Sequence, residues 1–221
     1  MKRAIIIMAK VPISGNVKTR LQSVISPEKS AELATAFLKD TVNKAKSICE
    51  NIIIAFFPPS EKEKLTEILP DEKKIIEQTG ENLGERMFSA FEFAFANGSD
   101  AVVILGTDSP TFPADFIEQA FEFLETNSDA VLGKTDDGGF YLIGLRVLPK
   151  EVFENVAWSS PKTFEEVYRN IMDLGLHLRE TPSWYDVDEP PDFEKLKAEF
   201  QHNANAKRRA PQTFEWIEKR V

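Results

Sequence analysis

Short apolar runs, separated by stretches with helical periodicity, are the feature that most constrains the fold of this chain. Residues 4–9 and 101–105 are such runs, and a third predicted strand, residues 51–57, is apolar after Asn51. An apolar run without polar alternation is typical of a strand buried on both faces of a parallel sheet. Between the runs, apolar side chains recur every three or four residues, which predicts amphipathic helices. The alternation predicts an α/β fold, in which a doubly wound, mostly parallel sheet has helices on both faces.

The second half of the chain adds a different pattern. Residues 129–134 and 140–145 read as two strands, and the turn residues between them favour a hairpin. A hairpin introduces an antiparallel strand, so we expect a mixed sheet. We predict a single domain over residues 1–200, followed over residues 201–221 by a polar, mobile connector and a short terminal helix.

Composition limits the class of partner. The chain has 221 residues, a formal net charge of −9 and one cysteine, Cys49. The negative charge argues against binding to a nucleic-acid backbone, because no basic face is available to displace its counterions. A lone cysteine excludes an intrachain disulfide and favours a reducing cytoplasm. No apolar run reaches the length of a signal-peptide core or a membrane span, so we expect a cytoplasmic protein that does not bind membranes.

The loop after the first apolar run is rich in cations. Lys10, Lys18 and Arg20 surround the turn formers Pro12 and Gly15. Open α/β folds bind phosphate-bearing ligands at the carboxyl ends of their strands, so this loop is a candidate phosphate site. It lacks the glycine pattern of a Walker A loop, and the chain has no G-x-G-x-x-G motif. The alternative is a solvated loop with ordinary surface lysines.

Asp108 and Asp188 are candidates for a metal site, and Asp186 is a candidate for the acceptor site beside it. Asp108 follows the run 101–105, and a carboxylate at the end of a buried strand is a natural oxygen ligand for Mg²⁺ or Mn²⁺. Asp186 and Asp188 alternate along an extended segment, which points both side chains to the same side. The alternatives are that Asp108 accepts hydrogen bonds within its own Ser-Pro turn and that Asp188 caps the helix that follows.

The turn of the predicted hairpin could contribute to an acceptor site. Asp137 stands beside the flexible pair Gly138-Gly139, and the alternative is that these residues only form the turn. Trp158 and Trp184 could line an acceptor pocket, although large aromatic side chains are more often part of a core.

The segment over residues 78–87 could approach a flat ligand. Its glycines, Gly80 and Gly84, flank the start of a predicted helix and permit close backbone approach, and Arg86 lies in the first turns. The alternative is an ordinary helix cap. The two histidines, His177 and His202, lie outside every candidate site, which argues against His-based zinc binding or general-base catalysis.

Five motifs occur in a fixed order along the chain. They are Ala9-Lys10-x-Pro12-x-x-Gly15-x-x-Lys18-Thr19-Arg20-Leu21, Leu83-Gly84-Glu85-Arg86-Met87, Gly106-Thr107-Asp108-Ser109-Pro110, Asp137-Gly138-Gly139-Phe140-Tyr141-Leu142-Ile143-Gly144-Leu145 and Trp184-Tyr185-Asp186-Val187-Asp188. Taken together, they resemble those of a bacterial and archaeal group within the GT-A superfamily of nucleotide-diphospho-sugar transferases, a group that is usually labelled a glycosyltransferase by fold. The first loop also looks related to the phospholactate and molybdenum-cofactor guanylyltransferases. The resemblance covers about residues 3–200.

The resemblance implies a Rossmann-like GT-A fold that binds a nucleotide with a divalent metal, Mg²⁺ or Mn²⁺. It places the metal on Asp108 and Asp188, and it assigns Gly84 and Arg86 to the segment beside the base. The first metal motif is Thr107-Asp108-Ser109 where many glycosyltransferases have Asp-x-Asp. The nucleotide-binding set that it implies is Lys10, Pro12, Gly15, Lys18, Thr19, Arg20, Gly84, Arg86 and Thr107.

Three functions compete at this stage. The first is nucleotidyl transfer from a nucleoside triphosphate to a small phosphorylated acceptor, with Lys18 and Arg20 stabilising the leaving pyrophosphate. The second is glycosyl transfer from an NDP-sugar, with Asp137 as general base. The third is a nucleotide-sensing module without turnover. The nucleotide base, the acceptor and the oligomeric state are left open.

Overall fold

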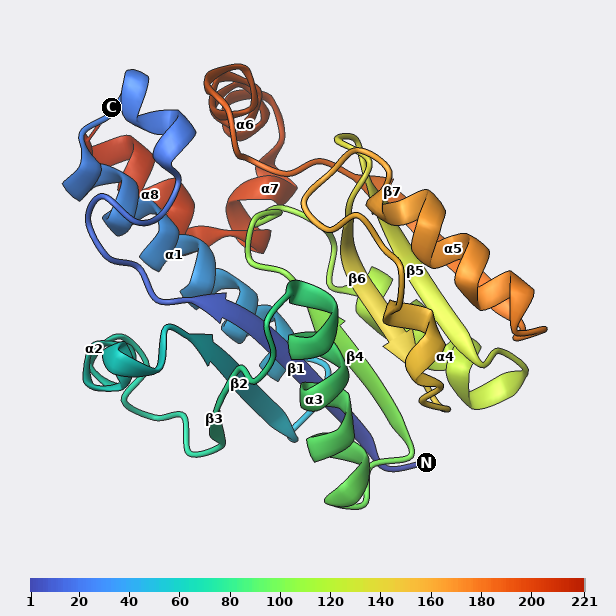
Figure 1. Ribbon diagram of the computed structural model, residues 1–221. Coiled ribbons are helices and arrows are strands. Elements are labelled where there is room, and N and C mark those ends of the chain that lie inside the picture. Colours follow the sequence, from blue (N-terminus) through green and yellow to red (C-terminus); the bar gives the residue numbers. More distant parts are fainter. Residues whose placement is uncertain (221) are drawn as a thin grey trace.

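Seven strands form one sheet in the computed structural model, which describes residues 1–220 (Figure 1). Their order across the sheet is β3-β2-β1-β4-β6-β5-β7. β6 runs antiparallel to both of its neighbours, and the other neighbouring pairs are parallel. The predicted mixed, mostly parallel α/β fold is therefore confirmed. The strands are β1 (Arg3–Lys10), β2 (Ile52–Phe57), β3 (Ile75–Glu77), β4 (Ala101–Leu105), β5 (Ala130–Thr135), β6 (Phe140–Leu145) and β7 (Leu178–Trp184).

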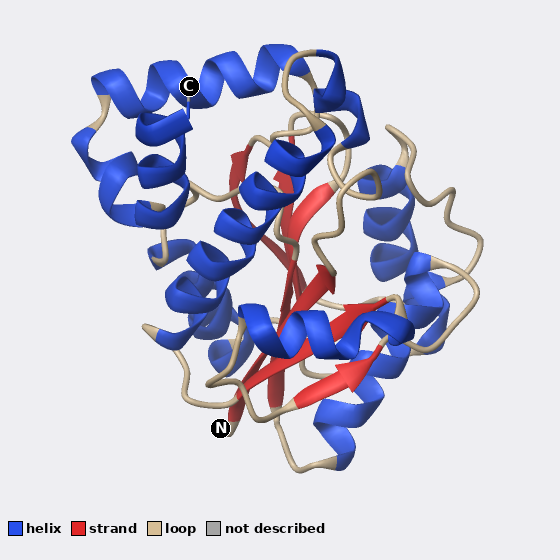
Figure 2. Ribbon diagram, turned by 90° about the vertical axis from the view of Figure 1, so that its left-hand side faces the viewer, coloured by secondary structure: helices blue, strands red, loops and turns tan. Residues whose placement is uncertain are grey.

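Helices cover both faces of this sheet, as the edge-on view shows (Figure 2). Along β1, Ile5 and Ile7 enter the hydrophobic cluster beneath α1 and α4, whereas Ala4 and Ile6 enter the cluster beneath α3 and α5. Two buried faces explain why the strand has no polar alternation. The helices of the two faces are α1 (Pro27–Lys46), α2 (Lys62–Ile68), α3 (Leu83–Ala96), α4 (Asp115–Thr126) and α5 (Thr163–Asp173).

Three C-terminal helices, α6 (Pro190–His202), α7 (Ala204–Arg209) and α8 (Pro211–Arg220), form a layer of their own beyond the carboxyl end of β1 (Figure 1). They share a third hydrophobic cluster with α1. The expected polar connector is wrong, because most of it is helix α7. The apolar contribution of α7 to the cluster is limited to Ala206, with Ala210 just after the helix. Two alanines in a polar segment give too weak a periodicity to predict a packed helix.

The sequence pattern also missed β7. This strand pairs only with β5 and lies at the edge of the sheet, and its sequence is mostly polar and contains Pro182. Edge strands tolerate such residues because one of their sides has no ladder to complete. Among the described residues, no helix has the length and hydrophobicity needed to cross a membrane.

Candidate active site

Two loops leave the same edge of the sheet. β1 and β4 are parallel neighbours, so the loop after Lys10 and the loop after Leu105 start close together at their carboxyl ends. The first loop turns through Gly15, whose φ of 81° is in the left-handed region that favours glycine. Lys18 also has a left-handed φ, 47°, where it precedes the 3₁₀ helix Thr19–Ser23. Lys18 also contacts Asp108, in the loop after β4.

The Lys18 ammonium bridges two carboxylates that are far apart in the sequence. Its Nζ donates hydrogen bonds to Oδ1 of Asp108 and, at 2.7 Å, to Oδ1 of Asp188. The Lys18 side chain is only 6% exposed, whereas those of Asp108 and Asp188 are 47% and 38% exposed. Burial disfavours the charged lysine, but attraction to the two carboxylates outweighs it and raises the pKa of Lys18 above its usual value. The structure thus brings together three of the predicted site residues.

One cavity of about 220 Å³ is lined by most of the residues predicted to bind phosphate or metal. We call it the Lys18 cavity. Pro12 is buried and does not line it, and the exposed Arg20 lies 3.9 Å from Glu189, next to Asp188. The predicted residues in its lining are Lys10, Lys18, Thr19, Thr107, Asp108 and Asp188.

Asp186 lies close to the same carboxylates. Its Oδ1 accepts a hydrogen bond from the Ser109 hydroxyl, and the backbone N–H of Val187 donates to the carbonyl of Asp108 at 2.9 Å. Burial, with the charges of Asp108 and Asp137, raises the pKa of Asp186 to about 7. Tyr185 and Val187 are buried while Asp186 and Asp188 are partly exposed, which is the alternation expected from the sequence.

Two residues that the sequence did not single out hold these loops in place. Glu199 of α6 accepts hydrogen bonds from the Thr111 hydroxyl at 2.8 Å and from the Tyr185 hydroxyl at 2.5 Å. Lys44 of α1 donates to the carbonyl of Pro110 at 2.8 Å. Glu199 therefore links the segment that carries Asp108 to the segment that carries Asp188. A glutamate and a lysine on helices have no local signal of such contacts.

The space beside Gly84 is occupied by the indole of Trp158. A Cβ atom on Gly84 would lie 2.4 Å from the ring of Trp158, so the glycine makes room for the indole. The Arg86 guanidinium lies 4.0 Å from the centre of the Phe57 ring, and its Nε donates to the carbonyl of Gly80. Both predicted residues thus have structural contacts beside the sheet edge, and a role for them in binding the base stays a prediction.

The hairpin residues form a tight turn that also contacts a neighbouring loop. Oδ1 of Asp137 accepts hydrogen bonds from the Thr135 hydroxyl at 2.6 Å and from the Gly139 N–H at 2.9 Å. A Cβ atom on Gly138 would lie 2.1 Å from the carbonyl oxygen of Pro161, so a side chain there would clash with the loop before α5. The negative charge of Asp137 is one of the causes that raise the pKa of Asp186.

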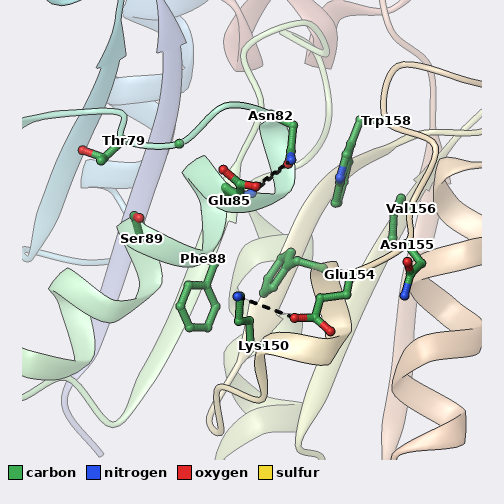
Figure 3. A pocket seen from close by; sticks show the side chains of 12 residues that line it. Thr79, Asn82, Glu85, Phe88, Ser89, Lys150, Glu154, Asn155, Val156 and Trp158 are labelled. Atoms are coloured by element: carbon green, nitrogen blue, oxygen red, sulfur yellow. Dashed lines mark hydrogen bonds and ion pairs between the residues drawn. The ribbon is translucent and has the colours of Figure 1, made fainter.

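The two candidate tryptophans differ in their surroundings. Trp184 packs against two of the hydrophobic clusters, and its Nε1 donates to the Thr111 hydroxyl at 3.2 Å. It also lines a cavity of about 260 Å³ together with Tyr185 and Glu199. Trp158 instead lines a cavity of about 540 Å³ beside α3 (Figure 3).

The carboxylates of this site fit a divalent metal in their chemistry. Asp108 and Asp188 already enclose a cation, the Lys18 ammonium, and both supply the hard oxygen ligands that Mg²⁺ and Mn²⁺ prefer. Within residues 1–220 there is no group of three or more His, Cys, Asp or Glu side chains arranged for metal binding. Two carboxylates are sufficient for Mg²⁺ when substrate phosphates and water complete its coordination.

Comparisons with known proteins agree with this fold. A family described as "Uncharacterized protein conserved in bacteria (DUF2064)" matches residues 41–160. A crystal structure from Desulfovibrio desulfuricans G20, provisionally described as a nucleotide-diphospho-sugar transferase, is 29% identical with a TM-score of 0.91, and the match covers 99% of this chain and 95% of that chain. No curated protein matches the chain significantly.

More distant structures share the fold. A cytidylyltransferase from Leptospira borgpetersenii serovar Hardjo-bovis is 18% identical with a TM-score of 0.58, and the match covers 99% of this chain and 94% of that chain. The inositol-1-phosphate CTP transferase from T. maritima is 17% identical with a TM-score of 0.54, and the match covers 97% of each chain. Together, the comparisons support an enzyme, a nucleotide-using transferase. The chain belongs to the DUF2064 family, and it has the fold of the nucleotide-diphospho-sugar transferases.

Proposed function

We propose that this protein transfers a nucleotidyl group from a nucleoside triphosphate to a small phosphorylated acceptor. The observation that carries the proposal is the Lys18 cavity, where Lys18 meets Asp108 and Asp188 at the carboxyl edge of the sheet. A cationic loop beside two acidic residues suits a triphosphate with its counter-ion better than a neutral ligand. Two of the structures that share the fold are described as a cytidylyltransferase and a CTP transferase, which is consistent with this chemistry.

In this reaction an oxygen of the acceptor phosphate forms a bond to the α-phosphorus, while the bond from the α-phosphorus to the bridging oxygen breaks. Pyrophosphate leaves with the electron pair and the negative charge. Lys18 and Arg20 would stabilise that charge, and exposed Lys10 would help to bind the triphosphate. Chemistry of this kind depends on positioning and on neutralising charge, and needs no covalent intermediate on the protein.

Asp108 and Asp188 would hold Mg²⁺ or Mn²⁺, which would neutralise phosphate charge. Lys18 now pairs with the same two carboxylates, so the metal and the ammonium would compete for them. Release of Lys18 would free its ammonium to contact the phosphates. Metal and nucleotide are therefore expected to bind cooperatively in this protein.

The test is metal-dependent release of pyrophosphate. Each of the four common nucleoside triphosphates is incubated with a panel of sugar and polyol phosphates, with Mg²⁺, with Mn²⁺ and with EDTA. We expect release with one triphosphate, only with metal, and its loss in Asp108→Asn. Binding of NDP-sugars together with no binding of any triphosphate would contradict the proposal. Triphosphate binding without turnover would favour the sensing module.

Glycosyl transfer is the second candidate, because the Desulfovibrio desulfuricans protein is provisionally described as a nucleotide-diphospho-sugar transferase. Asp137 would then act as general base for an acceptor hydroxyl. The hydrogen bonds from Thr135 and Gly139 engage its Oδ1, which leaves Oδ2 to accept a proton. Hydrolysis of one NDP-sugar in preference to all triphosphates would favour this candidate, and full turnover by Asp137→Asn would exclude the role of Asp137.

A further inference from the structure

A second cavity opens between α3 and the loop before α5. Its volume is about 540 Å³, within the range of pockets that hold small molecules, and it shares no lining residue with the Lys18 cavity (Figure 3). We call it the Trp158 pocket. The start of α3 that borders it follows β3, so this end of the pocket opens at the same sheet edge as the Lys18 cavity.

One wall of the Trp158 pocket is aromatic. Phe153 stacks on Trp158, with ring centres 6.5 Å apart and planes 24° apart, and Phe88 meets the edge of Phe153 at 6.2 Å. Trp158 and Phe88 are both partly exposed, so the wall presents ring surface to the cavity. Flat apolar surface of this kind binds the C–H face of a ring-shaped ligand.

The loop that carries Trp158 is fixed in position on both sides. The absence of a side chain on Gly84 lets the indole pack against α3, and the absence of one on Gly138 lets Pro161 approach the hairpin. Asn155 and Ser159 have left-handed φ values of 55° and 59°, which non-glycine residues adopt at an energetic cost. The rest of the structure must maintain that conformation, so the aromatic wall is preorganised.

The polar lining of the pocket favours hydroxyl groups over phosphate. Its charged side chains are two carboxylates, Glu85 and Glu154, and one ammonium, Lys150, whose Nζ lies 3.6 Å from Glu154, while Glu85 accepts hydrogen bonds from the Asn82 amide and the Glu81 N–H (Figure 3). The net negative charge repels an anion. Each carboxylate oxygen can accept more than one hydrogen bond, so Glu85 and Glu154 both keep capacity for ligand hydroxyls, and the neighbouring amide of Asn155 can donate and accept.

We propose that the Trp158 pocket binds a neutral, hydroxyl-rich ring of the sugar or cyclic polyol class, with its apolar face on the aromatic wall and its hydroxyls on Glu85 and Glu154. This inference rests on the proposed function. The ring would be the carbon skeleton of the phosphorylated acceptor, and the phosphate group of the acceptor would point toward the Lys18 cavity. The same contacts determine the specificity of the enzyme for its acceptor.

The test uses saturation-transfer NMR on the full chain with methyl hexosides of the glucose, mannose and galactose series, and with myo-inositol. Cytidine and guanosine are run in parallel as nucleobase probes. The variants are Glu154→Gln and Trp158→Phe. The matched control is Glu151→Gln, an exposed neighbour outside the lining of the pocket. Circular dichroism verifies that each variant is folded.

We expect at least one hexoside or myo-inositol to bind, with affinity reduced about tenfold in Glu154→Gln, a loss typical of a hydrogen bond to a charged group. Trp158→Phe should weaken it further and Glu151→Gln should leave it unchanged. Absence of binding by every sugar and polyol probe, binding of nucleosides alone, or equal binding by all variants would overturn the proposal. Triphosphate binding, measured on the same samples by thermal shift, is a separate readout, so failure of the pocket and failure of the proposed function are distinguishable.

Discussion

At the scale of single residues, Lys18 determines the charge of the candidate site. Its ammonium is nearly closed off from solvent between Asp108 and Asp188, and these carboxylates have no comparable cation without it. A buried charge is stable only while it is paired. The pair of carboxylates should therefore take up another cation whenever Lys18 leaves.

The first prediction follows from this competition. In Lys18→Met, Mn²⁺ should bind more tightly than in the unmodified protein, by about tenfold or more, because the metal no longer displaces an ammonium. Electron paramagnetic resonance of free Mn²⁺ measures the affinity. The control is Lys10→Met, which removes an exposed lysine from the same cavity and should change Mn²⁺ binding little. Weaker binding in Lys18→Met would show that no metal competes for this position.

Lys44 is the second residue whose charge matters. Burial outweighs the attraction of Asp40 and lowers the pKa of Lys44 to about 7, with Arg209 lowering it and Glu199 raising it by smaller amounts. The unfolded chain should titrate near the ordinary value of 10.5. Between these values the unfolded chain binds more protons than the folded protein. The free energy of unfolding therefore rises with pH across this window, and the cost of the buried charge is complete below it.

The second prediction is a difference between two pH profiles. From pH 7 to 10, the unmodified protein should gain up to about 1.4 kcal/mol of unfolding free energy per pH unit from this one group. Lys44→Met lacks that contribution, so its stability relative to the unmodified protein should fall as the pH rises. Urea unfolding of both proteins at intervals over this range measures it. Parallel profiles would mean that Lys44 keeps an ordinary pKa.

At the scale of elements, one aspartate of α1 forms hydrogen bonds with the first turn of the terminal helix α8. Asp40 is 1% exposed and accepts hydrogen bonds from the Gln212 N–H at 2.9 Å, the Thr213 N–H at 2.8 Å and the Thr213 hydroxyl at 2.6 Å. The two N–H groups belong to the first turn of α8, where a helix has no backbone acceptors of its own. Asp40 thus caps a helix that lies about 170 residues further along the chain.

The third prediction concerns this cap. Asp40→Ala should lower the free energy of unfolding by about 2–4 kcal/mol, because it removes three hydrogen bonds and leaves buried donors unpaired. Chemical denaturation measures the loss. Asp71→Ala removes an exposed aspartate and should change stability by no more than about 0.5 kcal/mol. If both variants lost the same stability, the cap would have no special role.

At the scale of the whole molecule, ligand binding should be visible as stability. A nucleotide that binds only the folded protein adds about 2.7 kcal/mol to the unfolding free energy at a concentration of 100 times its Kd. For a chain of 221 residues this corresponds to a rise in Tm of roughly 5–10 °C.

The fourth prediction is that this rise needs both partners. A triphosphate with Mg²⁺ should raise Tm more than the sum of the shifts from either alone, since each helps to displace Lys18 from the carboxylates. A thermal-shift panel of triphosphates and NDP-sugars, each with and without Mg²⁺ and Mn²⁺, provides the measurement. Strictly additive shifts would argue against the exchange of Lys18 for a metal.

The sequence by itself determined the fold class and the sheet edge at which the site lies. Both follow from local patterns. A continuous apolar run such as residues 4–9 is stable only when it is buried on two faces, and the loops that follow parallel strands all start at the same edge of the sheet. The candidates Lys18, Asp108 and Asp188 could be named for the same reason. The weakly patterned parts, α7 and β7, could not be identified this way.

Only the tertiary structure decided which side chains meet. Nothing local specifies that Lys18 lies between two aspartates, that Trp158 occupies the space over Gly84, or that Glu199 joins two loops. Such contacts join positions up to 170 residues apart, and they depend on how whole helices and loops pack against one another. Periodicity reports the environment of one segment, whereas a contact is a property of two segments and the packing that brings them together.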